Sequence, residues 1–460
     1  MNNPSVDRTA APANTQKDGS ATSDVPLENF IPVSRLALLE RLSKAERLAL
    51  PGEECESCKK LFRYLSIWRH QTYQKRLARL KRYYLPFSPD RDTKRVRQHD
   101  PKRLKEYKNN LIKEVNHLLV QANFDLIDKK ELERLLQTNS VHGLELNVDL
   151  GEFDEVMIYA RGLEIETIEK RLPEHFYRKK EFKVPIYQRL FLLLKLKSVE
   201  QRVAEIMEEH KVSEKKARKI NKKQRRGLPD DPEGQYVYLR LFKNIPQEDL
   251  EMMFPNTQVK LCLFDKIKLG ITAGGGTLAG LVGAASKIAS AFATANPIGL
   301  AVAIFGLVGV IFRQIMSVFN TRTKYMMMLA QRLFFHSLAN NRGVLTLLVD
   351  RAEEEDVKED MLFYFFLLRH PMPDRELGEE GKLDEMIEEY LADQFGVEVD
   401  FDIRDPLDRL NKDHMLVRGK DGLIYARPPE EACRLLEYKW RASLTSEEVN
   451  EDDDEFEGDV

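Results

Sequence analysis

The chain has 460 residues, a net charge of −3 and a mean hydropathy of −0.45, and 32% of its residues are charged. The length allows more than one hydrophobic core, and four cysteines exclude a disulfide framework. The near-neutral sum hides local extremes, because segments 59–108 and 211–226 are strongly basic while 447–459 is almost continuously acidic.

The first two dozen residues are rich in Asn, Ser, Thr, Ala and Asp, and they lack both the apolar core of a secretory signal and the Arg-rich pattern of a transit peptide. They predict a disordered tail over residues 1–28. The pair Cys55 and Cys58 has no second Cys/His pair at zinc-finger spacing. We therefore expect no metal site and no cofactor here, only two thiols at the start of a helix.

A basic α+β domain is predicted over residues 29–262. Apolar residues recur on one helical face in 54–84 and again in 103–122. The period then changes to two in 144–150, which predicts a hairpin with Val156 and Ile158. Two further strands, 182–196 and 236–242, flank a charged helical insertion at 198–226. The expected architecture is helices followed by about four antiparallel strands, with the helices on one side of the sheet.

The stretch from Leu269 to Phe312 contains a single charged residue, Lys287. A membrane span needs about 20 apolar residues, so this length predicts a transmembrane helical hairpin over 266–320, with arms 269–289 and 297–319. The alternative is a buried hairpin of a soluble core. Small residues at G-x-x-x-G spacing predict close helix packing in the membrane and a homo-oligomer; they are Gly270, Gly274, Gly276 and Gly280.

Cations flank the apolar stretch on both sides, with Lys266 and Lys268 before it and Arg313, Arg322 and Lys324 after it. An excess of Lys and Arg marks the cytoplasmic side of a membrane. The pattern predicts an integral membrane protein with both termini on that side. The lack of a transit-peptide pattern favours a bacterial inner membrane with cytoplasmic termini, and the alternative is a mitochondrial membrane.

A helical, winged-helix-like domain is predicted over 321–443, followed by a disordered acidic tail over 444–460. Its expected order is two helices (353–369 and 382–395), a strand (397–401), a third helix from Asp405, a hairpin around 419–422 and a last helix to Trp440. Cations and acids balance in the third helix, which argues against DNA reading and favours a protein contact or a structural role.

The run 211–226 is the strongest binding candidate, because anionic lipid headgroups or an acidic partner attract such clusters. RNA is attracted by the same charge, and the alternative is a solvated charged helix. The acidic tail is a candidate to screen this run in cis. The candidate residues are Lys215, Lys216, Arg218, Lys219, Lys222, Lys223, Arg225 and Arg226.

No phosphate-binding loop, H-E-x-x-H motif or G-x-S-x-G elbow occurs, so no catalytic residue is predicted. The consecutive acids Glu353 to Asp356 point around a helix and are expected to form its solvated start.

Five short segments, in their order around the apolar stretch, resemble a family of uncharacterised two-span membrane proteins that includes mitochondrial transmembrane protein 143. The segments are 30–33 (FIPV), 86–90 (PFSPD), 159–162 (YARG), 241–251 (LFKNIPQEDLE) and 340–345 (NNRGVL). The resemblance runs from about Phe30 to Trp440 and implies no activity and no catalytic residues.

The sequence thus predicts a membrane-anchored, non-enzymatic scaffold or adaptor that contacts the lipid bilayer and an unknown protein partner. The alternative is a membrane-tethered nucleic-acid-binding protein that uses the basic segments. A solute pore is a weaker alternative, because neither predicted arm carries a polar stripe.

Overall fold

The computed structural model describes residues 27–43, 52–90, 100–137, 144–147, 150–171, 179–225, 227–247, 250, 253–255, 258–261, 333–373 and 382–445, with isolated positions between 308 and 331. Its helices are α1 (Arg35–Ser43), α2 (Gly52–Tyr84), α3 (Pro101–Gln121), α4 (Lys129–Gln137), α5 (Val199–His210), α6 (Glu214–Gln224), α10 (Arg342–Leu367), α11 (Leu383–Phe395), α12 (Arg404–Lys412) and α13 (Pro429–Thr445). Its strands are β1 (Asp125–Leu126), β2 (Leu144–Asn147), β3 (Phe153–Arg171), β4 (Lys179–Leu196), β5 (Val237–Pro246), β6 (Gln258–Leu261), β7 (Ser337–Asn340), β8 (Met372–Pro373), β9 (Leu416–Arg418) and β10 (Leu423–Ala426).

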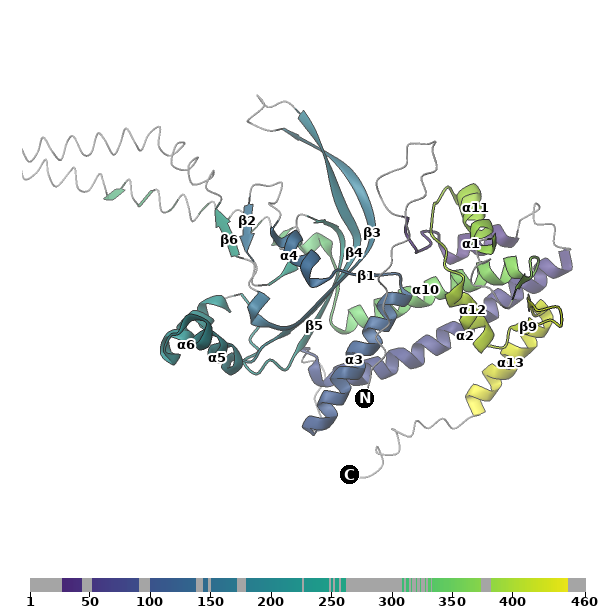
Figure 1. Ribbon diagram of the computed structural model, residues 1–460, viewed down its shortest axis with the longest axis horizontal. Coiled ribbons are helices and arrows are strands. Elements are labelled where there is room, and N and C mark those ends of the chain that lie inside the picture. Colours follow the sequence, from purple (N-terminus) through teal and green to yellow (C-terminus); the bar gives the residue numbers. More distant parts are fainter. Residues whose placement is uncertain are drawn as a thin grey trace, which may run out of the picture.

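The main sheet has five strands in the order β1-β3-β4-β5-β7, and every neighbouring pair is antiparallel. β3 and β4 form a long hairpin whose far half rises beyond the rest of the sheet (Figure 1). The α+β class with an antiparallel sheet was thus predicted. The pairing of residues 144–150 with 156–158 was wrong, because β2 pairs with β6 instead.

Both faces of this sheet are covered. Leu190, Leu192 and Leu194 of β4 pack toward α4 and Phe254, whereas Phe191 and Leu193 pack against α2, α3 and α10. A strand that is buried on both faces reads as a continuous apolar run, as residues 190–194 do. Period-two alternation does not reveal the second face, so the prediction of helices on one side was incomplete.

Helix α10 is the centre of the structure. It is buried along most of its length and contacts helices from both ends of the chain, namely α2, α3, α11 and α12. It begins at Arg342, a full three turns before the predicted start at Glu353. The early start follows from Val344, Leu345 and Leu348, which are fully buried against α2 and α3.

The last part of the chain packs on α10 and forms a second sheet in the order β8-β10-β9. The described elements run α10, β8, α11, α12, the β9-β10 hairpin and α13, which is the order of a winged helix. The predicted strand at 397–401 was misplaced, because the pairing strand is β8 and precedes α11. Val399 and Phe401 alternate because both pack in the core from extended chain, where Val399 forms an isolated bridge with Glu28.

The membrane prediction is corrected by the helices. A spanning helix needs about 20 consecutive apolar residues. α2 and α10, with 33 and 26 residues, are long enough, but charged residues interrupt both. Among the described residues, no helix combines the necessary length and apolar composition. This finding contradicts the assignments as an integral membrane protein and to the bacterial inner or mitochondrial membrane. Most of the predicted hairpin, including Gly270, Gly274, Gly276 and Gly280, lies outside the described residues.

Asn341 joins β7 to α10 with φ 49° and ψ −119°, a conformation that is strained for any residue except glycine. Its side-chain amide donates to Asp90 Oδ1 at 2.9 Å, and its backbone N–H donates to Leu239 O at 2.8 Å. We expect Asn341→Ala to lower the free energy of unfolding by about 2 kcal/mol, because the strain stays while the amide contact is lost. Asn341→Gly should lower it by less, since glycine relieves the strain.

Urea unfolding of the two variants and the wild type measures this order. An alanine variant at least as stable as the glycine variant would show that the backbone at residue 341 is not strained.

Candidate anion-binding cleft

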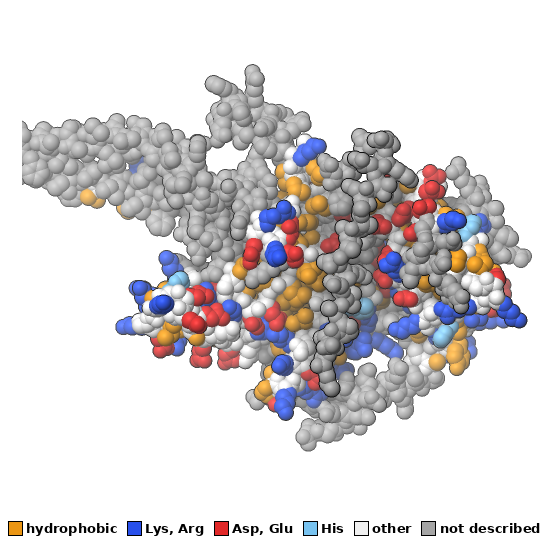
Figure 2. All heavy atoms as spheres, in the orientation of Figure 1, with side chains coloured by type: hydrophobic (Ala, Val, Ile, Leu, Met, Phe, Trp, Pro, Cys, Tyr) orange, Lys and Arg blue, Asp and Glu red, His pale blue; other side chains and the backbone are white. Residues whose placement is uncertain are grey.

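A cleft of about 980 Å³ lies where α2, α3, α12 and α13 meet. In Figure 2, Lys and Arg side chains gather over the part of α2 between α3 and α13. Three carboxylates line the cleft, Glu114, Asp356 and Asp413. Eight cations outnumber them, and they are Arg69, Lys75, Arg76, Arg79, Arg82, Arg409, Lys412 and Lys439. The cleft is therefore strongly positive.

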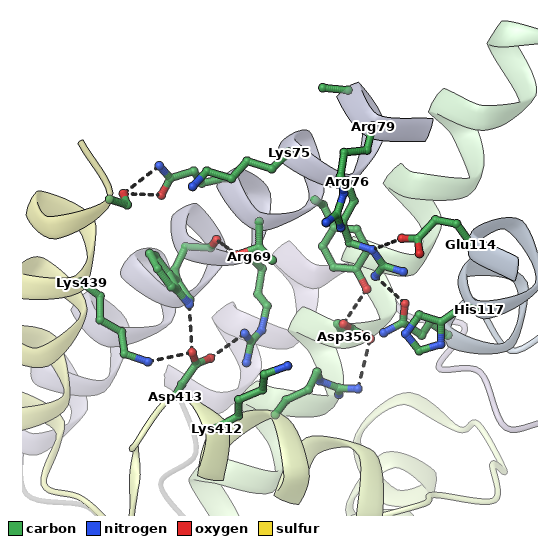
Figure 3. Close-up of a pocket in the computed structure, with 18 of the residues that line it drawn as sticks. Arg69, Lys75, Arg76, Arg79, Glu114, His117, Asp356, Lys412, Asp413 and Lys439 are labelled. Carbon is green, nitrogen blue, oxygen red and sulfur yellow. Dashed lines mark hydrogen bonds and ion pairs between the residues drawn. The ribbon is translucent and has the colours of Figure 1, made fainter. Parts of the chain in front are cut away.

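One stripe of α2 supplies most of this charge. Positions three and four apart lie on the same face of a helix, which aligns Arg69, Arg76 and Arg79 along one side of α2. Tyr73 lies on the same stripe but is buried beneath it. α12 and α13 supply the opposite wall, with Lys412 and Lys439 (Figure 3).

The floor of the cleft is an ion network around Arg69, whose side chain is only 8% exposed. Its Nε donates to Asp360 Oδ2 at 2.7 Å and its Nη1 donates to Asp413 Oδ2 at 2.6 Å. Asp413 also accepts from Trp68 Nε1 at 3.1 Å and from Lys439 Nζ at 3.0 Å. Burial alone would raise the pKa of Asp413, but the nearby cations Arg69 and Lys439 hold it below its ordinary value.

Arg409 of α12 completes the floor by binding three acids of α10. Its Nε donates to Asp360 Oδ1 at 2.9 Å, its Nη2 donates to Glu359 Oε2 at 2.7 Å, and its Nη1 lies 3.1 Å from Asp356 Oδ1. Tyr73 donates its hydroxyl to Asp356 Oδ2 at 2.6 Å. These contacts join α2, α10 and α12 into one rigid support.

For two of these acids, burial is the largest of the influences on the pKa. It raises the pKa of Asp356 to about 6 and that of Glu359 to about 8, although Arg409 opposes both shifts. The network has three cations, Arg69, Arg409 and Lys439, for four carboxylates. A proton on Glu359 makes these charges equal, which agrees with its raised pKa.

Two guanidinium nitrogens of the cleft lining have buried N–H groups that no described residue accepts, Arg69 Nη2 and Arg76 Nη2. The rest of Arg76 is fixed, since Nε donates to Glu114 at 2.7 Å and Nη1 donates to Gln121 at 2.6 Å. Leaving a buried donor without an acceptor costs about 1–3 kcal/mol. Both residues line the cleft, and an anionic oxygen bound there reaches these nitrogens once the side chains that cover them shift aside.

A second group of contacts, around Glu355, brings together segments that carry the resemblance to the two-span membrane family. Glu355 of α10 accepts from the Ile31 N–H at 3.2 Å, from Arg161 Nη2 at 3.2 Å and from Lys358 Nζ at 2.9 Å. The guanidinium of Arg161 lies 4.2 Å from the centre of the Phe30 ring. The expectation that residues 353–356 form a solvated helix start was therefore wrong, because Arg161 and Arg409 pair with Glu355 and Asp356 in the interior.

The candidate cations of the 211–226 run lie on and after α6, at the opposite end of the structure from α13 (Figure 1). Lys215, Lys216, Arg218, Lys219, Lys222 and Lys223 are exposed. Arg225 instead has a structural contact, because its Nε donates to the buried carboxylate of Glu152 at 3.2 Å. Arg226 lies outside the described residues. The structure brings none of the described members of this run into the cleft.

Sequence reasoning identified segment 59–108 as basic but missed the cleft. The available signal was the spacing of Arg69, Arg76 and Arg79 on one helical face. The charge balance of the third helix also paired Arg409 with Asp405 and Asp408 of the same helix. The partners of Arg409 in the structure are instead acids of α10.

The fold and the cleft define an α+β protein with a basic cleft between its helices. Residues 153–343 match the model of a domain family described as protein of unknown function (DUF3754). This domain contains the hairpin β3-β4, α5, α6, β5 and β7, and it ends at the start of α10. The residues that line the cleft lie on either side of it in the sequence. A comparison with solved structures found no match.

Proposed function

We propose that the protein is a non-enzymatic adaptor that binds a small polyphosphorylated ligand in the cleft between α2, α3, α12 and α13. The observation that carries the proposal is the pair of buried, unaccepted N–H groups on Arg69 and Arg76, set among six further cations. Guanidinium groups held in a fixed position are suited to phosphate oxygens, and Nη2 of each of these two arginines can donate a charge-assisted hydrogen bond.

The size of the cleft supports a compact ligand. A volume of about 980 Å³ lies at the upper end of the range of about 300–1,000 Å³ for small-molecule pockets. The network of Asp360 and Asp413 holds Arg69 in place before a ligand arrives, so binding does not have to order this side chain.

Isothermal titration with inorganic tripolyphosphate tests the proposal. Arg79 and Lys412 are exposed residues of the cleft wall, so their replacement leaves the buried network intact. The double variant Arg79→Gln/Lys412→Gln should bind tripolyphosphate about 10–100-fold more weakly, because it removes two charged contacts worth about 1 kcal/mol each.

The matched control is Lys216→Gln/Lys219→Gln, which removes the same charge from exposed positions of α6. It should bind tripolyphosphate as the wild type does. No measurable tripolyphosphate binding, either by the wild type or by a chain whose segment 447–459 has been made neutral, would refute the proposal. Equal losses of affinity in both double variants would show only general attraction by surface charge.

Nucleic-acid binding is the second candidate function. The six exposed cations of α6 are a better candidate surface for it than α12, the third helix of the winged-helix order. The main cation of α12, Arg409, is used by buried acids and has no freedom to reach a phosphate backbone. This candidate predicts an affinity for single-stranded RNA that falls steeply with salt and that Lys216→Gln/Lys219→Gln weakens. Anionic lipid headgroups and an acidic protein partner are proposed for the same surface.

The wider relationship to the family that includes mitochondrial transmembrane protein 143 is also proposed. Its support is that the resembling segments contact one another: Phe30 lies against Arg161, and Asn341 donates to Asp90. Residues that serve such contacts are expected to recur together in proteins of one fold.

A further inference from the structure

α13 leads the chain out of the structure beside the cleft. Tyr438, Lys439, Ala442 and Ser443 line the cleft, and the helix ends at Thr445, less than one turn later. Gln71 Nε2 of α2 donates to Ser443 Oγ at 2.9 Å, which holds this end of α13 against the cleft wall. Segment 446–460 therefore starts at the rim of the cleft.

The sequence of this segment complements the cleft. It contains no Lys or Arg, and its nine acids are Glu447, Glu448, Glu451, Asp452, Asp453, Asp454, Glu455, Glu457 and Asp459. The cleft carries the opposite charge, with eight cations and three carboxylates. Several acids close together resemble a polyphosphate in charge density, and charge-assisted hydrogen bonds to arginine are available to both.

The length of the segment is sufficient. An extended chain covers about 3.3–3.6 Å per residue, so even the first five residues reach across a cleft whose volume of about 980 Å³ corresponds to a width of about 10 Å. A segment tethered at the rim also has an effective concentration in the millimolar range, which favours docking without high intrinsic affinity.

We propose that the acidic segment 447–459 occupies the basic cleft of its own chain and competes with the polyphosphorylated ligand. The competition rests on the proposed function, but the docking itself does not. The segment starts beside the cleft and not beside α6, which lies at the other end of the structure (Figure 1). The cleft is therefore the docking site, in place of the 211–226 run that the sequence suggested.

Zero-length carbodiimide cross-linking of the full chain tests the docking. The reagent joins a carboxylate to a lysine in contact with it, and mass spectrometry identifies the pair. We expect links from residues 447–459 to Lys75, Lys412 or Lys439. Links to Lys216, Lys219 or Lys222 of α6 instead, or no links from the segment, would overturn the proposal.

Mixing unlabelled and ¹⁵N-labelled chains before cross-linking separates docking within one chain from docking between chains. Links within one isotopic form only are expected. Mixed links at the statistical ratio would overturn the assignment to the same chain.

A full-length variant with the nine acids changed to Asn or Gln tests the competition while keeping the length of the chain. It should bind tripolyphosphate at least tenfold more tightly than the wild type, whereas an unchanged affinity would refute the competition. Cross-links to the cleft without tripolyphosphate binding by either chain would refute the proposed function alone. Tripolyphosphate binding without cross-links would refute the docking alone.

Discussion

Replacing Arg409 with methionine should lower the free energy of unfolding by about 3–5 kcal/mol. The guanidinium of Arg409 contacts Asp356, Glu359 and Asp360, and its removal leaves these carboxylates in the interior with fewer partners. Removing one partner of a buried ion pair is strongly destabilising, because the remaining charge has lost its water and gains nothing in exchange. Urea unfolding at pH 7 measures the loss as a lower midpoint.

The matched control is Arg404→Met, which makes the same change at an exposed position of the same helix. Its effect should stay within about 0.5 kcal/mol, as is usual for surface positions. A loss of less than about 1 kcal/mol for Arg409→Met would mean that α12 does not pack on the acids of α10 as described.

The variant Glu359→Gln should be about as stable as the wild type near pH 4.5 and more stable by about 2–4 kcal/mol at pH 8.5. Burial raises the pKa of Glu359 to about 8, far above the ordinary value of 4.5. Between these two pH values the folded state binds more protons than the unfolded state, so the contribution of Glu359 to stability falls as the pH rises. Glutamine cannot ionise, and it still offers an acceptor to Arg409.

Unfolding free energies of both chains at half-unit steps from pH 4.5 to pH 8.5 give a difference curve that isolates Glu359. The difference should grow steadily with pH. Parallel profiles would contradict a raised pKa and would make Glu359 an ordinary ion-pair partner of Arg409.

Local sequence patterns predicted the helices that bury one face in the core. The helix expected at 54–84 is observed at Gly52–Tyr84, and the one expected at 382–395 is observed at Leu383–Phe395. In both, apolar residues at helical spacing face the core, and that spacing is visible in the sequence.

The same patterns failed where partners are distant in the sequence. Asp360 is buried because Arg69 and Arg409 pair with its carboxylate. These partners lie 291 positions before it and 49 positions after it in the chain. No local rule distinguishes such an acid from a solvated one. Hydropathy likewise described only the composition of residues 269–312, and it predicted spanning helices that do not occur among the described helices.

The cleft was only partly predictable for the same reason. The cations of α2 share one helical face, which spacing reveals, but Lys412 and Lys439 reach the site from elements more than 300 residues away. The unaccepted N–H groups of Arg69 and Arg76 follow from packing geometry alone.

A crystal structure of the protein with tripolyphosphate tests the central claim most directly. The account predicts phosphate oxygens in the cleft within hydrogen-bond distance of Arg69 Nη2 and Arg76 Nη2, with Lys412 or Arg79 against the outer phosphate. Tripolyphosphate bound on α6 while the cleft holds none would contradict it.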